Sequence, residues 1–140
     1  MEAGIFVFRV FLAALIGTII GLITGREVAN SRIFAIICMG SALVTITSTE
    51  FFKFSGLPWI GDPGRISAQV ISALGFIGIG FIWVAEDGRI KDLPVAASLW
   101  IVAIMGLLAG AGMIRTAMVA LLFLMLVKWV YPSLMKQKDH

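Results

Sequence analysis

The sequence VAASLWIVAIMGLLAGAGMIRTAMVALLFLMLVKWVY, residues 95–131, contains only two charged side chains, Arg115 and Lys128. About 20 helical residues cross a bilayer core of about 30 Å, so one helix over this stretch would be far too long for a single crossing. Gly110-Ala111-Gly112 lies near its middle, and glycine adopts turn dihedrals at little cost. The stretch therefore predicts two membrane helices, at residues 95–111 and 113–131, joined by a tight reversal.

Three more apolar stretches precede this one, at residues 5–23, 33–52 and 66–85. The whole chain of 140 residues is 60% hydrophobic and 14% charged, with a mean hydropathy of +1.04. These values are typical of helical membrane proteins. We therefore predict an all-α membrane protein, a bundle of about five transmembrane helices. We expect one transmembrane domain over residues 1–140, with no soluble C-terminal domain.

The basic residues indicate how this bundle is oriented. With five spans, one side of the membrane receives Arg26, Arg32, Arg89, Lys91, Lys128, Lys136 and Lys138, and the other receives Arg9, Lys53, Arg65 and Arg115. The positive-inside rule places the richer side in the cytoplasm, with the N-terminus outside. Because these residues lie between apolar runs, the net charge of +3 indicates membrane topology and no nucleic-acid partner.

A group of polar residues is expected at similar depth near the outer face: Arg9, Glu50, Asp62, Arg65, Gln69 and Arg115. Ionisable groups inside lipid are costly, so they usually have partners or a function. One interpretation is a structural ion-pair network between helices. The other is a site for a small ion, an anion or a partner protein. Because the group is rich in Arg, a cation cage made of oxygen ligands is disfavoured, and we predict no metal site.

The polar residues at the start of the third span can be interpreted in two ways. Asp62 followed by Pro63 is a good helix start, because Asp accepts from free backbone N–H groups and Pro suits the first turn. The spacing of Asp62, Arg65 and Gln69 also places all three on one helical face. Asp62 is therefore either an N-cap or part of a polar stripe that needs partners on other spans.

Glycines recur at helical spacing in three of the spans: Gly17 and Gly21, then Gly75, Gly78 and Gly80, then Gly106 and Gly110. Small residues at such spacing let membrane helices approach closely. Packing within the chain is the simpler interpretation, and homodimer contact is the alternative. Hydroxyl residues in the second span, such as Thr45 and Thr49, are expected mostly to bond to their own backbone or to bridge helices, and pore lining is the less favoured alternative.

The sequence lacks the usual motifs of enzymes. Its one His, His140, is terminal, and there is no zinc-type spacing of Cys and His, no phosphate loop and no nucleophile elbow. The single Cys38 lies inside an apolar run and is expected to be buried and unreactive. We expect no catalytic residue and no cofactor.

Several of these stretches together resemble the MgtC/SapB family of bacterial inner-membrane proteins. The resemblance rests on Asp62-Pro63-Gly64-Arg65-Ile66-Ser67-Ala68-Gln69-Val70, on Gly75-Phe76-Ile77-Gly78-Ile79-Gly80, and on Ala96-Ala97-Ser98-Leu99-Trp100. Arg9 and Gly40-Ser41-Ala42-Leu43 also match, whereas Gly25-Arg26-Glu27 departs from the family's pattern after the first span.

The resemblance implies a multi-pass protein of the bacterial inner membrane, linked to magnesium homeostasis, growth in low magnesium and virulence. It also implies a regulator of membrane energetics or ion homeostasis, with ATP synthase as one partner proposed for the family. Our first hypothesis is a non-enzymatic regulator that acts through helix contacts in the bilayer, with itself or another membrane protein. The alternative is a small ion transporter or channel that uses the polar group near the outer face.

Overall fold

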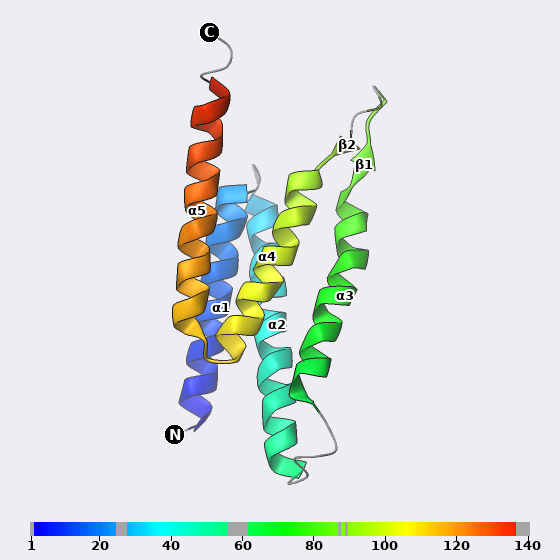
Figure 1. Ribbon diagram of the computed structural model, residues 1–140. Coiled ribbons are helices and arrows are strands. Elements are labelled where there is room, and N and C mark those ends of the chain that lie inside the picture. Colours follow the sequence, from blue (N-terminus) through cyan, green and yellow to red (C-terminus); the bar gives the residue numbers. More distant parts are fainter. Residues whose placement is uncertain (1, 25–27, 56–61, 87, 89, 137–140) are drawn as a thin grey trace.

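The computed structural model describes residues 2–24, 28–55, 62–86, 88 and 90–136 (Figure 1). Within these residues the chain forms five helices and one short antiparallel ribbon. The helices are α1 (Glu2–Thr24), α2 (Val28–Ser55), α3 (Pro63–Phe81), α4 (Leu93–Gly110) and α5 (Ile114–Lys136). The ribbon pairs β1 (Trp83–Val84) with β2 (Ile90–Lys91).

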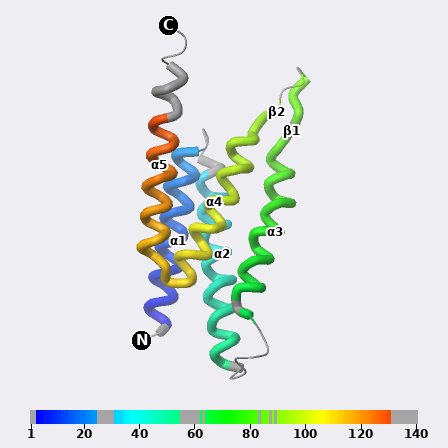
Figure 2. The backbone as a smooth tube through the Cα atoms, in the orientation of Figure 1, coloured from blue at the N-terminus to red at the C-terminus, as the bar shows by residue number. Residues whose placement is uncertain are grey.

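Successive helices run in opposite directions along one bundle (Figures 1 and 2). Helix α4 occupies the centre, because it packs against α1, α2, α3 and α5, while α1 also packs along α2. One end of the bundle therefore gathers the start of α1, the end of α2, the start of α3 and the α4–α5 turn; we call it the Arg9 end. The opposite end, which carries the end of α1 and the second half of α5, is the Lys128 end.

The core lies between α1, α2 and α4, with α5 closing one side. Its buried residues are Ala13, Ile16, Ile20, Phe34, Cys38, Ala42, Leu99, Val102, Met105, Ala109, Ala117 and Leu121. The expected burial of Cys38 is thus confirmed. Several of these residues are small, which lets the helices approach one another closely.

The outside of the bundle is apolar as well. Phe76 is 82% exposed and Trp129 is 77% exposed, and Phe11 and Phe123 are also exposed. A water-soluble protein rarely leaves so much apolar surface uncovered. Within the described part of the chain, four helical segments are long and apolar enough to cross a membrane: Ala3–Thr24, Ser31–Phe54, Gly64–Phe81 and Leu93–Gly110. The chain is therefore a helical membrane protein.

The predicted reversal between the last two helices is confirmed. Helix α4 ends at Gly110, and Gly112 adopts a left-handed φ of 79°. The Gly112 N–H donates to the Ala109 carbonyl at 3.1 Å, and the Met113 N–H donates to the Leu108 carbonyl at 2.9 Å. These two bonds form a Schellman motif, which ends a helix at a glycine with positive φ.

The third helix differs from its predicted range. It begins at Pro63 instead of Ile66, because the Asp62 side chain caps its first turn, and it ends at Phe81 instead of Ala85. Trp83 and Val84 pair with Lys91 and Ile90 in the ribbon. Aromatic and β-branched side chains favour extended backbone, so the apolar run continues past the helix as a strand.

Candidate functional site

The polar residues predicted near one face belong to helix segments at the Arg9 end, except Asp62, which directly precedes α3 there (Figure 1). Their partners differ from those of an interhelical ion-pair network. Among the residues that the structure describes, Arg9 is the one member of this group whose side chain bonds to another helix: its Nη1 donates to the Gly110 carbonyl at 3.1 Å. Among the described residues, Glu50 and Asp62 have their observed partners within or next to their own helices.

Arg9 stabilises the end of α4. The last carbonyls of a helix have no partner within it and carry partial negative charge. The Arg9 guanidinium supplies both a donor and a positive charge to one of them, at Gly110. The turn is shaped around this side chain, because a Cβ at Gly112 would lie 2.6 Å from Arg9 Nη2. Arg9 thus fixes α1 to the α4–α5 turn.

The Glu50 carboxylate pairs with a lysine one turn away on the same helix. Lys53 Nζ lies 2.7 Å from Glu50 Oε1, and the two side chains are 66% and 38% exposed. An exposed pair of this kind contributes little to stability. Sequence reasoning placed Glu50 among three arginines and overlooked this closer lysine.

Asp62 is the N-cap of α3, as the Asp-Pro pair predicts. Its carboxylate accepts from the Gly64 N–H at 2.8 Å. Because the carboxylate already occupies this helix N-terminus, an incoming anion would meet its negative charge. The geometry therefore disfavours an anion site at the start of α3.

Arg65, Gln69 and Arg115 are exposed. In the part of the chain that the structure describes, their side chains make no hydrogen bond or ion pair. Arg65 and Gln69 extend from α3 and Arg115 from α5, all near the Arg9 end. These three groups therefore remain open to lipid headgroups, water or another protein.

A pocket of about 360 Å³ opens between α2, α3 and α4 beside these residues. Hydroxyls of Thr45, Thr49 and Ser67 lie among its otherwise apolar lining. Thr45 donates to the Ser41 carbonyl at 3.0 Å, and Thr49 donates to the Thr45 carbonyl. As expected, both threonines bond to their own helix, which leaves a mostly apolar pocket. Spacing within α2 did not indicate the pocket, because α3 and α4 form its other walls.

Two glycines of α1, Gly17 and Gly21, and the two glycines of α4 allow close packing inside the chain. A Cβ at Gly17 would lie 2.5 Å from the Phe34 carbonyl oxygen, and one at Gly21 would lie 2.5 Å from Ser31 Cα. Gly106 and Gly110 meet α2 in the same way, at the Cys38 and Ala42 carbonyls. The backbones of α1 and α4 therefore approach α2 at positions that any side chain would obstruct.

Three glycines in the second half of α3 have no such neighbours. A Cβ at Gly75, Gly78 or Gly80 would meet no atom within 4 Å. Gly78 is buried, whereas Gly75 and Gly80 are exposed and lie beside the exposed side chains of Phe76 and Ile79. We call Gly75, Phe76, Ile79 and Gly80 the α3 face. It combines small and large apolar residues on a surface that the chain itself leaves uncovered.

The chain is similar in sequence to several known bacterial proteins. YhiD of Escherichia coli K12 is 37% identical over 92% of this chain and 61% of its own length. SapB of Bacillus subtilis is 34% identical, with shares of 91% and 60%, and MgtC of Salmonella typhimurium is 30% identical, with shares of 89% and 53%. The chain thus spans about half to three fifths of these relatives. No solved structure matches.

The family model for the MgtC family matches residues 10–137, which includes the third-span motif and the α4–α5 turn. Gly25-Arg26-Glu27, where the sequence departs from the family's pattern, lies outside the described residues. The resemblance inferred from the motifs is confirmed: the chain belongs to the MgtC family.

Proposed function

We propose that this protein is a non-enzymatic regulator in the bacterial inner membrane that binds another membrane protein through the α3 face. The observation that carries the proposal is the contrast between the glycines. Gly17, Gly21, Gly106 and Gly110 are covered by α2, whereas Gly75 and Gly80 face open space. Small residues promote close contact between membrane helices, so the exposed pair suits a helix of a partner.

The partner class follows from the family. Family resemblance suggests a protein of membrane energetics or ion homeostasis, such as ATP synthase, and a role in growth at low magnesium. A second copy of this chain is the other candidate for the α3 face. In the proposed topology all five helices cross the membrane, with the N-terminus outside and the Lys128 end in the cytoplasm. With five spans, the sequence assigns seven of the eleven Lys and Arg residues to that side of the membrane, and the positive-inside rule places the richer side in the cytoplasm.

Complementation of a bacterium that lacks its own family member tests this proposal. Growth at limiting magnesium is measured with Gly80→Leu, which fills the α3 face. Gly40→Leu is the matched control, because a Cβ at Gly40 of α2 also meets no atom within 4 Å. We expect Gly80→Leu to lose growth while Gly40→Leu keeps it. Equal growth of both variants, at equal levels of folded protein, would contradict a role for the α3 face.

An ion transporter is the second candidate function. It is favoured by the exposed Arg65 and Gln69 beside the pocket of about 360 Å³ between α2, α3 and α4. The relative YhiD is also provisionally named a magnesium transporter. Liposomes with purified protein separate the two functions: a transporter gives Mg²⁺, proton or anion flux that Arg65→Gln reduces, whereas the regulator gives none above protein-free liposomes.

A further inference from the structure

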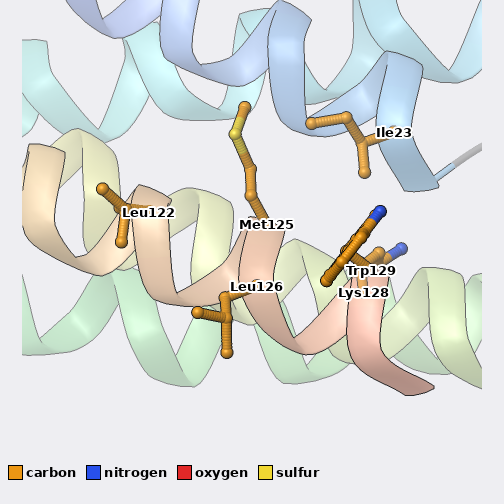
Figure 3. A pocket seen from close by; sticks show the side chains of 6 residues that line it. All are labelled: Ile23, Leu122, Met125, Leu126, Lys128 and Trp129. Atoms are coloured by element: carbon orange, nitrogen blue, oxygen red, sulfur yellow. The ribbon is translucent and has the colours of Figure 1, made fainter. Parts of the chain in front are cut away.

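A groove runs between α1 and α5 at the Lys128 end, away from the α3 face. It holds about 550 Å³, within the range of about 300–1,000 Å³ that ligand sites occupy. Figure 3 shows its lining: Ile23 of α1, with Leu122, Met125, Leu126, Lys128 and Trp129 of α5.

The groove exists because α5 is buried mainly along its first half. Ala117 is fully buried and Leu121 is 5% exposed, whereas Leu126 and Trp129, further along, are 50% and 77% exposed. In this second half, the Lys128 ammonium reaches α1 by donating to the Thr24 hydroxyl at 2.9 Å. Apolar side chains line the space between the two helices, and this space opens toward the bilayer.

Lys128 places one positive charge at the end of this apolar groove. An ammonium has three donors, and a hydroxyl acceptor such as Thr24 does not neutralise its charge. Among the described residues, no carboxylate lies within ion-pair distance of Lys128. Trp129 follows directly, and exposed Trp beside Lys at the end of a membrane helix is typical of the level of the lipid headgroups.

We infer that this groove binds an anionic phospholipid. An acyl chain lies along Leu122, Met125 and Leu126, and the headgroup phosphate pairs with Lys128. The assignment rests on charge complementarity: basic pockets between membrane helices bind anionic headgroups, and lipid is the apolar partner that surrounds every membrane helix. The site is independent of the proposed α3 face, because it lies on α1 and α5.

Fluorescence quenching by brominated lipids tests this site. Trp129 is kept as the only tryptophan through Trp59→Phe, Trp83→Phe and Trp100→Phe. The protein is placed in equimolar phosphatidylglycerol–phosphatidylcholine vesicles in which one lipid or the other is brominated. We expect Trp129 to prefer phosphatidylglycerol about fivefold over phosphatidylcholine, as one basic residue near an anionic headgroup implies.

Charge variants assign the preference to Lys128. Lys128→Gln should remove it and Lys128→Arg should retain it. Arg32→Gln, which removes an exposed charge of α2 at the same end of the bundle, should also retain it. Equal quenching by both lipids in the parent, or an unchanged preference in folded Lys128→Gln, would overturn the inference. So would a Trp129 that neither lipid quenches, because a second protein chain would then cover the groove.

Discussion

Replacing Gly106 by Ala should separate α4 from α2. A Cβ at this position would fall closest to the Cys38 carbonyl oxygen, and it would lie 2.7 Å from Ser41 Cβ and 3.0 Å from the Cys38 carbonyl carbon. Two of these three atoms belong to the α2 backbone, which cannot move aside as the end of a flexible side chain can. The helices must therefore move apart along a seam that also includes Gly110 and Ala42.

Two opposing effects set the size of the change. Ala is favoured over Gly inside a helix by about 1 kcal/mol. Overpacking a well-packed interior costs about 1–3 kcal/mol, and a clash between two backbones belongs near the upper end of that range. We therefore expect Gly106→Ala to lower the free energy of unfolding by about 1–2 kcal/mol.

Unfolding in mixed micelles, followed by tryptophan fluorescence as sodium dodecyl sulfate is added, measures this difference. Gly75→Ala is the matched control, because it adds the same methyl group at a helical position with open space. It should be neutral or stabilise the protein by up to about 1 kcal/mol. If Gly106→Ala proves as stable as Gly75→Ala, the inferred close contact between α2 and α4 is wrong.

Three further changes probe the Arg9 end, each by the same unfolding measurement. Arg9→Gln should cost about 1–2 kcal/mol, because a hydrogen bond from a charged donor to the Gly110 carbonyl is weakened; a neutral result would show that this bond does not stabilise the fold. Asp62→Ala should cost about 1 kcal/mol and Asp62→Asn much less, since Asn caps helices about as well as Asp; equal losses would refute the N-cap role. Glu50→Gln should change stability by less than about 1 kcal/mol, because its pair with Lys53 is exposed; a larger loss would indicate a partner beyond Lys53.

Features that depend on neighbours along the chain were predictable from the sequence. The reversal at Gly110-Ala111-Gly112 follows from the limit on helix length in a bilayer and from the dihedral freedom of glycine, and the structure has a left-handed Gly112 there. The N-cap at Asp62 follows from Asp and Pro in adjacent positions. The sequence predicts that the third helix ends at Ala85, whereas α3 ends at Phe81. The difference arises because an apolar run is compatible with a membrane helix and with a strand.

Features that depend on contacts between helices were not predictable. Depth in the membrane suggested a carboxylate partner for Arg9, whereas its partner is a backbone carbonyl at a helix end. The sequence feature that could have indicated this contact was the glycine-rich C-terminus of α4, which lies at the same depth as Arg9. The spacing of the α1, α3 and α4 glycines likewise predicts close packing for all three helices, but only tertiary structure shows that Gly75 and Gly80 remain uncovered.

The central claim is that the α3 face binds a partner in the membrane. The most direct test places a photoreactive benzoylphenylalanine at Ile79 in living cells, with Val119 of α5 as control, since these side chains are 69% and 56% exposed. We predict a discrete protein crosslink from position 79 that Gly80→Leu abolishes and Gly40→Leu preserves, with none of equal strength from position 119. Equal crosslinks from both positions, or a crosslink from position 79 that Gly80→Leu leaves unchanged, would contradict the proposed function.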